Sequence, residues 1–284
     1  MAVALMYGTI DLKTESRVAT IWLNRPERHN AFNATLITKL MHACEVVGQS
    51  DAVRVIVLAG RGRSFSAGGD LNWMRQAAKL TDAENLDDAR MLARMLRTLA
   101  CLRKPTIARV HGAAIGGGLG LAAACDMCVA STEASFATSE VRLGLIPAAI
   151  SPYVVRAIGA RQAYRYFQTA ERISAVHAAQ IGLVHEVVEP GRLDAKIKEL
   201  TDALMQGGPQ AQDQAKQLIR SVSETESIDT IIDETAQRIA RIRVDDEAQE
   251  GITAFLEQRP ANWIPASPAQ ATRDSTSPGT KDES

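Results

Sequence analysis

The feature that most constrains the fold is a regular alternation of short β-branched segments with longer segments of helical periodicity. Residues 17–24, RVATIWLN, and residues 53–60, VRVIVLAG, are apolar and rich in β-branched side chains, which predicts strands. Between them, residues 31–49 place apolar side chains at helical spacing. Further strands are expected in KPTIARVHG, MCVAS and ASFAT. Strands that alternate with helices predict an α/β fold with parallel strands and crossover helices.

Composition indicates an ordinary globular protein with small-molecule rather than polymeric partners. Of the 284 residues, 46 % are hydrophobic and 23 % are charged, and the formal net charge is −1. A nucleic-acid or membrane surface favours a basic face, so neither partner is expected. No run approaches the roughly 20 apolar residues that cross a bilayer, and the start, MAVALMYGTI, lacks the basic region of a signal peptide. We therefore expect a cytoplasmic location.

The chain divides into three segments by its patterning. Residues 1–206 carry the alternation of strands and helices. Residues 207–263 show helical periodicity with little strand signal, which predicts a helical appendage. Residues 264–284 hold almost no large apolar side chains, so they cannot bury enough surface to offset the cost of ordering, and we expect a disordered tail.

Two glycine-rich turns follow expected strands and indicate an anion site. They are SFSAGGD, residues 64–70, and IGGGLG, residues 115–120. Ligands bind at the carboxyl ends of strands in α/β proteins, and free N–H groups at a helix N-terminus attract negative charge. Two such groups that converge on one oxygen form an oxyanion hole. The spacing matches neither a dinucleotide fingerprint nor a P-loop; close packing of a helix on a strand is the alternative explanation for the glycines.

Five motifs in order resemble the enoyl-CoA hydratase/isomerase family, also called the crotonase superfamily. The motifs are LNRPERHNAF, RSFSAGGDL, HGAAIGGGLGLAAACD, FATSEVRLGLIP and EGITAFLEQRPANW, and the resemblance extends over residues 8–263. It implies an α/β spiral of ββα turns with a C-terminal helical region that builds homotrimers, commonly paired into homohexamers. It also implies an acyl-CoA substrate, no cofactor beyond the coenzyme A of that substrate, and no metal.

The resemblance assigns the catalytic groups. The backbone N–H groups of Gly69 and Gly117 would hold the thioester oxygen while an enolate-like anion develops. Glu140, in SEVRLG, would be the acid/base, and apolar walls around it would raise its pKa toward neutral pH. Hydratases of the family have a further glutamate where this chain has Gly120, which is therefore expected to contact the substrate without supplying a proton.

A single carboxylate leaves the reaction open. Glu140 could hold water and return its proton in a syn hydration, or it could shuttle a proton between Cα and Cγ, as in 3,2-enoyl-CoA isomerases. A non-catalytic acyl-CoA-binding protein is an alternative of another class. Residues 143–175, from LGLIPAAISP onward, resemble the bacterial 3-methylglutaconyl-CoA hydratases of leucine degradation and the related isohexenylglutaconyl-CoA hydratase. This second resemblance favours hydration of a branched glutaconyl-type ester, with Arg75 and Arg156 as candidate partners of its distal carboxylate.

The same resemblance implies contacts along coenzyme A. Arg28 would meet a phosphate, and Ala67 and Gly68 belong to the turn that wraps the adenine. Phe255 matches an aromatic residue that approaches the adenine from a neighbouring subunit, and Arg259 would replace a cation that is common near that position.

Four other residues invite a chemical role but are expected to be structural. Cys125 and Cys128 form a CxxC, but no second Cys/His pair with ligand spacing lies nearby, which favours two small buried residues. Asp70 is placed to cap a following helix. His111, just before the glycine run, is expected to make a structural hydrogen bond.

Overall fold

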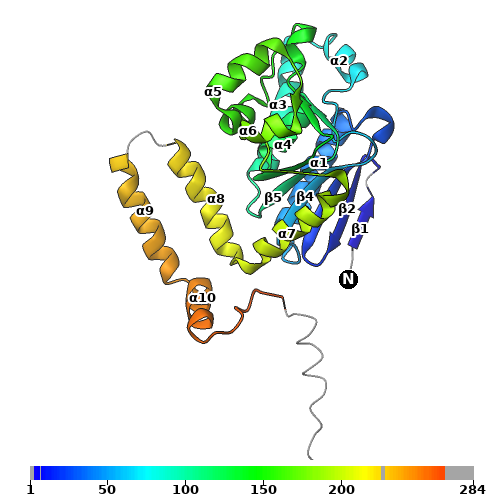
Figure 1. Ribbon diagram of the computed structural model, residues 1–284. Helices are drawn as coiled ribbons and strands as arrows, with labels where there is room; N and C mark the ends of the chain where they lie inside the picture. The colour runs from blue at the N-terminus through cyan, green and yellow to red at the C-terminus, as the bar shows by residue number, and fades with distance from the viewer. Residues whose placement is uncertain (1–2, 7, 225–227, 266–284) are drawn as a thin grey trace, which may run out of the picture. The chain divides into compact units, whose positions relative to one another are not determined.

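The computed structural model describes residues 3–6, 8–224 and 228–265, and its contacts divide the chain into two units after Asp202 (Figure 1). The strands are β1 Val3–Met6, β2 Ile10–Glu15, β3 Val18–Leu23, β4 Val55–Gly60, β5 Thr106–Val110, β6 Ala113–Ile115, β7 Met127–Ser131, β8 Ser135–Ala137, β9 Ile173–Ser174 and β10 Glu186–Val188. The helices are α1 Ala34–Gln49, α2 Leu71–Ala77, α3 Asp82–Ala100, α4 Gly117–Ala124, α5 Ser151–Thr169, α6 Ala175–Gln180, α7 Leu193–Gln206, α8 Pro209–Glu224, α9 Ile228–Arg243 and α10 Asp246–Leu256. Short 3-10 helices lie at η1 Pro26–Arg28, η2 Glu140–Leu143 and η3 Pro190–Arg192.

A seven-stranded sheet forms the frame of the larger unit, in the order β1-β2-β3-β4-β5-β7-β10. From β3 to β10 every neighbouring pair is parallel, so the expectation of parallel strands with crossovers is confirmed there. The strands β1, β2 and β3 are antiparallel instead. Ser16 and Arg17, which join β2 to β3, both have positive φ, and so short a turn connects only antiparallel neighbours.

A smaller sheet brings the glycine-rich turns together. It has the order β6-β8-β9, with β6 parallel to β8. Ser66, in the first glycine-rich turn, forms a bridge with Ala114 of β6, and Phe32 forms a bridge with Gly69. Segments that are far apart in the sequence therefore lie side by side just before α4 begins.

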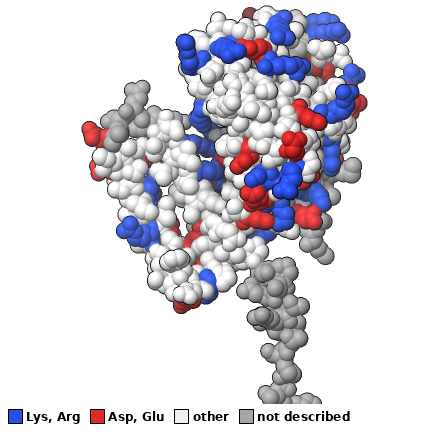
Figure 2. All heavy atoms as spheres, in the orientation of Figure 1, with Lys and Arg blue, Asp and Glu red and all other residues white. Residues whose placement is uncertain are grey.

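The surface of the larger unit carries charges of both signs. On the face that Figure 2 shows, basic and acidic side chains lie among one another rather than in a field of one sign. Among the described residues, no helix has both the length and the apolar composition that a bilayer-crossing segment requires.

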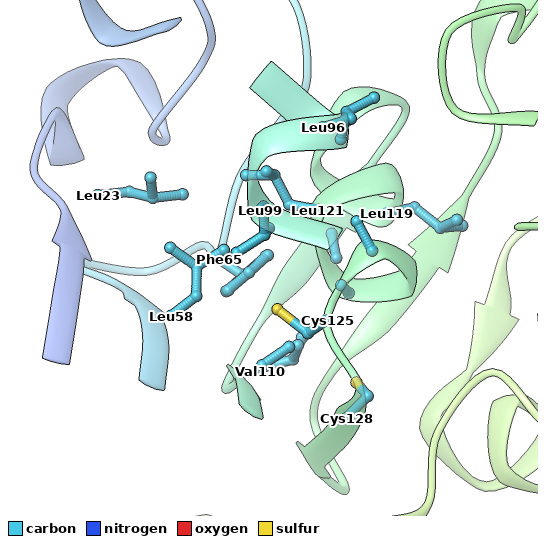
Figure 3. Packing of buried hydrophobic residues seen from close by; sticks show 14 of the residues in the cluster. Leu23, Leu58, Phe65, Leu96, Leu99, Val110, Leu119, Leu121, Cys125 and Cys128 are labelled. Atoms are coloured by element: carbon cyan, nitrogen blue, oxygen red, sulfur yellow. The ribbon is translucent and has the colours of Figure 1, made fainter. Parts of the chain in front are cut away.

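The core lies between the main sheet and a helical layer that includes α1 and α3. Each of these helices contributes fully buried side chains: Leu36, Ile37 and Leu40 from α1, and Met95, Leu96 and Leu99 from α3. Figure 3 shows Leu58 and Val110 of the sheet together with Leu99 and Leu121 of the helices. The α3 helix begins with a capping box in which Thr81 and Glu84 bond each other's backbone, a local signal for its start.

The two cysteines of the CxxC are part of this core. Cys125 and Cys128 are buried and form no disulfide, and Figure 3 shows Cys125 beside Val110. Burial raises the pKa of the Cys128 thiol to about 12, so it stays protonated and unreactive. Their expected structural role is confirmed.

The second unit begins at Ala203, and the regular elements among its described residues are helices, as expected for the region after residue 207. Several of its large apolar side chains are exposed, among them Leu218, Ile219, Val222, Ile232, Ile239, Ile252, Phe255 and Leu256. Of the expected disordered tail, residues 266–284 lie outside the described residues.

A hydrogen-bonded pair ties the start of β5 to the start of β7. Asp126 Oδ2 accepts from the Thr106 N–H at 2.8 Å and from its hydroxyl at 2.9 Å, while the Asp126 N–H donates to Thr106 Oγ1 at 2.8 Å. We expect Asp126→Ala to lower the free energy of unfolding by about 2 kcal/mol or more, because the buried Thr106 N–H loses a charged acceptor. Urea denaturation at fixed protein concentration measures the change. Asp87→Ala, which removes an exposed pair with Arg90, should cost less than about 1 kcal/mol; equal effects of the two variants would contradict the prediction.

Candidate active site

The two glycine-rich turns approach each other more closely than side chains would allow. Gly68 has φ +86°, and a Cβ added there would lie 2.7 Å from the Ile115 carbonyl oxygen and 3.4 Å from the Gly117 nitrogen. Such a position requires glycine both for its backbone conformation and for its lack of a side chain. The glycines therefore place the backbone of one turn directly beside the first amide of α4.

The backbone N–H groups of Gly117 and Gly69 have no acceptor among the described residues. Gly117 is the first residue of α4, so no carbonyl of its own helix can accept from it, and the dipole of the helix favours negative charge at this end. On the other turn, the Gly68 N–H donates to Ser66 Oγ at 3.3 Å and the Asp70 N–H donates to the Phe32 carbonyl at 2.8 Å. Gly69 lies between these two residues in the sequence, and its own N–H remains available to a ligand.

Apolar side chains support both amides from behind. A Cβ at Gly117 would lie 2.5 Å from the Phe32 ring, and a Cβ at Gly69 would lie 2.5 Å from Met74 Cε. The Phe32 N–H also donates to the Gly68 carbonyl at 2.6 Å, so the residue that backs one amide is bonded to the turn that carries the other. This arrangement fixes the two N–H groups relative to each other.

The loop before Phe32 holds the first turn through Asn30. The Asn30 side chain is fully buried, and its amide donates to the carbonyls of Arg61 and Ser64 at 2.8 Å and of Phe65 at 3.1 Å. Its Oδ1 accepts from the Arg25 N–H at 2.8 Å. One side chain thus provides hydrogen-bond partners for three carbonyls of residues 61–65 and for the N–H of Arg25.

An ion pair adds to this frame. Arg25 Nη2 lies 3.0 Å from Asp70 Oδ2, and both side chains are largely buried. Burial opposes ionisation of Asp70, but its hydrogen bond from the Asn72 N–H and its contact with Arg25 outweigh burial, so the pKa of Asp70 lies below its usual value. Asp70 thereby caps α2, as expected from the sequence.

Glu140 lies over the start of α4. It opens η2, and a Cβ added to Gly116 would lie 2.9 Å from Glu140 Oε1, so the carboxylate is next to the residue that precedes the Gly117 amide. The other oxygen, Oε2, is buried and has no hydrogen-bond partner among the described residues. Burial raises the pKa of Glu140 above its usual value. A half-buried carboxylate with an unused oxygen, near the free amide at the start of α4, can exchange a proton with a bound molecule.

Gly120 faces an isoleucine rather than a polar group. A Cβ at Gly120 would collide with Ile150 Cγ2 and lie 2.8 Å from Ile150 Cβ. No side chain fits at residue 120 while Ile150 keeps its place.

The residues expected along coenzyme A differ in their surroundings. Arg28 and Ala67 are exposed, as a ligand contact requires. Phe255 and Arg259 belong to the second unit, where Phe255 is 83 % exposed. The Arg259 guanidinium is paired with Glu250 at 2.8 Å and with Glu257 at 2.7 Å, and this pairing lowers the pKa of Glu250 to about 2. The expected replacement cation is thus held by two acidic side chains.

His111 has the structural role expected for it. Its Nε2 lies 2.8 Å from the Gly62 carbonyl, to which it donates, and burial is the main cause that lowers its pKa. A neutral ring that holds a turn accounts for the residue without a role in proton transfer.

Three residues of the site escaped the sequence analysis: Phe32, Met74 and Ile150. Each fills the space next to a glycine. Phe32 and Ile150 lie in the quoted motifs and Met74 just after one, but nothing in the spacing says which glycine each one meets.

Comparison with known proteins agrees with this geometry. The sequence profile described as Enoyl-CoA hydratase/isomerase matches residues 13–265. The chain belongs to this family. It is therefore an enzyme of the enoyl-CoA hydratase type, a carbon–oxygen lyase, and its α/β fold with C-terminal helices is the crotonase fold.

Relatives and solved structures match over most of the chain. The crystal structure of an enoyl-CoA hydratase from Shewanella pealeana is 42 % identical, with a TM-score of 0.87, and the match covers 90 % of this chain and 96 % of that one. A crotonyl-CoA hydratase of Syntrophomonas wolfei is 32 % identical over 92 % of this chain and 99 % of its own length. A 2,3-dehydroadipyl-CoA hydratase of Escherichia coli is 32 % identical over 86 % and 94 %.

The position of the Phe32 ring leads to a test of the Gly117 amide. We expect Gly117→Ala to lower kcat for crotonyl-CoA hydration by about 10²–10³, the loss typical of an oxyanion donor, because the new methyl group displaces either the ring or the start of α4. Gly191→Ala is the matched control, since a Cβ there meets nothing within 4 Å. Steady-state kinetics with circular dichroism measures both; a Gly117→Ala enzyme as fast as the control would contradict the role.

Burial of Glu140 predicts a pH-dependent stability. Its folded-state pKa lies above the unfolded value, so the folded protein loses stability as pH rises from the usual carboxyl range through the raised pKa. Glu140→Gln, which cannot ionise, should therefore gain stability relative to the natural protein over this pH range and keep a constant difference above it. Thermal unfolding from pH 4 upward measures the trend, and a difference independent of pH would refute it.

Proposed function

We propose that this enzyme adds water across the double bond of an enoyl-CoA thioester whose acyl group is of the branched glutaconyl type, 3-methylglutaconyl-CoA or isohexenylglutaconyl-CoA. Gly69 and Gly117 would hold the thioester oxygen, and Glu140 would transfer the proton. The observation that supports this best is the half-buried Glu140 carboxylate, with one unpartnered oxygen, beside the free amide at the start of α4.

The reaction can be written with these groups alone. The two N–H groups draw electron density toward the thioester oxygen and make Cβ electrophilic. Water held by the Glu140 carboxylate attacks Cβ while the carboxylate accepts a proton from it. The electron pair of the double bond moves to Cα and the thioester oxygen, and Cα then takes the proton from Glu140. Oxygen and hydrogen are added to the same face, and the carboxylate is restored.

A substrate with a distal carboxylate agrees with two observations. The segment around Ile150 carries the glutaconyl-type resemblance, and the Escherichia coli relative is named for a dehydroadipyl ester, which also has a second carboxylate. Arg75 on α2 and Arg156 on α5 have exposed side chains and are the proposed partners.

Isomerisation is the second candidate, favoured by the single carboxylate. With Gly120 packed on Ile150, proton transfer at both Cα and Cγ would fall to Glu140, which is the inventory of a 3,2-enoyl-CoA isomerase. However, the three similar proteins described above are named as hydratases.

We further propose a homotrimer or homohexamer, a cytoplasmic location, and no partner beyond acyl-CoA. The exposed apolar side chains of the second unit support self-association. The described residues contain no group of three or more potential metal ligands. The interspersed charges of the face in Figure 2 are not those of a nucleic-acid or membrane surface. We propose no separate cofactor, because coenzyme A enters as part of the substrate.

The substrate panel tests this proposal. Purified protein is given 3-methylglutaconyl-CoA, isohexenylglutaconyl-CoA, crotonyl-CoA and a 3-enoyl-CoA, and absorbance of the conjugated thioester is followed. We expect loss of conjugation, with the largest kcat/KM for a glutaconyl ester. Glu140→Ala should lower kcat by at least about 10². Gain of conjugation from the 3-enoyl ester alone would establish isomerisation instead, and an unchanged rate in Glu140→Ala would remove its proposed role.

A further inference from the structure

The packing around the first turn of α4 gives a steric reason why residue 120 is glycine and carries no second carboxylate. We propose that Ile150 is a specificity-determining residue: it fills the place into which any side chain at residue 120 would project, so that the pair Gly120 and Ile150 limits the site to the single carboxylate of Glu140. The inference rests on the proposed function for its catalytic consequence, but its steric part stands on geometry alone.

Glu140 and Ile150 lie against two positions of the same helix end, at Gly116 and Gly120 of the first turn of α4. The Gly120 N–H donates to the Gly116 carbonyl at 3.0 Å, so the two glycines lie one helical turn apart. A Cβ on Gly116 would meet the Glu140 carboxylate, and a Cβ on Gly120 would meet Ile150. The isoleucine thus stands about one turn beyond the carboxylate, next to the helix end that carries the Gly117 amide.

Rotation of the Ile150 side chain does not relieve the collision. The added Cβ at residue 120 would lie 2.8 Å from Ile150 Cβ itself, and this atom does not move when χ1 changes. Contacts below 3.0 Å require a shift of the backbone. A side chain at residue 120 therefore needs a smaller residue at position 150.

The backbone of Ile150 is itself held in place. Its carbonyl accepts from the N–H groups of Tyr153 and Val154, both at 3.1 Å, at the start of α5. The side chains of Ile150 and Val154 are 2 % and 1 % exposed, so both are packed in the core. Moving Ile150 away from α4 would disturb these bonds and this packing together.

An apolar side chain at residue 150 is also compatible with the burial of the Glu140 carboxylate. The carboxylate has one oxygen without a partner and a raised pKa caused by burial. A second carboxylate beside it would share the desolvated site and repel the first. With isoleucine there, a single group carries every proton transfer.

The steric part is tested by stability. We expect Gly120→Ala to lower Tm by at least about 5 °C in the natural protein. Ile150→Ala keeps the colliding Cβ and should relieve only part of this loss, whereas Ile150→Gly removes that atom and should relieve most of it. Val154→Ala, a truncation in α5 at a residue that is not among the atoms a Cβ at Gly120 would meet, is the control and should leave the loss unchanged. Equal losses in the Ile150→Gly and natural backgrounds would overturn the inference.

The catalytic part is tested with Gly120→Glu. In the Ile150→Gly background we expect the added glutamate to raise kcat/KM for crotonyl-CoA hydration at least about tenfold over Ile150→Gly alone, and to add a titrating group to the pH–rate profile. A folded double variant with neither change would overturn the role of Ile150. If the natural enzyme hydrates no enoyl-CoA while the Tm coupling is present, the proposed function fails and the steric pair stands.

Discussion

The site depends on the close approach of two backbone segments that contain no side chains where they meet. Gly68 lies against the Ile115 carbonyl and the Gly117 nitrogen, at distances that exclude a Cβ. Because the amides belong to the backbone, their positions are set by the sheet bridges at Ser66 and Gly69 and by the start of α4. The proposed anion site would thus be set by strand register rather than by side-chain conformation, and its donors would be uncharged and preorganised.

Buried polar groups of the preceding loop hold the first glycine-rich turn in place. The buried Asn30 amide bonds carbonyls of the first glycine-rich turn, and the largely buried Arg25 side chain pairs with the Asp70 side chain at the end of that turn. Removing one partner of such a set leaves the others unsatisfied in a site of low dielectric, which is more costly than the loss of one bond. The loop motif RPERHNA therefore also has a structural role, through Arg25 and Asn30, that its resemblance to a coenzyme-binding segment does not reveal.

Sequence patterns predicted the elements well and the contacts between them poorly. Strands, the α1 helix and the helical second unit follow from periodicity, because periodicity is local. The antiparallel start was missed, since the turn at Ser16 and Arg17 carries no glycine or proline signal. The contacts of Phe32 and Ile150 with Gly117 and Gly120 were also missed, because neighbours from distant segments depend on register and helix placement that local periodicity does not reveal. The contact of Met74 with Gly69 is local, but it depends on where α2 begins and how it is oriented.

The unpartnered Oε2 of Glu140 makes ligand affinity depend on proton count. A ligand that offers a hydrogen-bond donor to this oxygen stabilises the ionised carboxylate, whereas a ligand that offers only apolar surface removes water and stabilises the protonated form. Binding of the two kinds of ligand is therefore coupled to proton release and proton uptake, respectively. We therefore expect the affinities for these two kinds of ligand to change with pH in opposite directions.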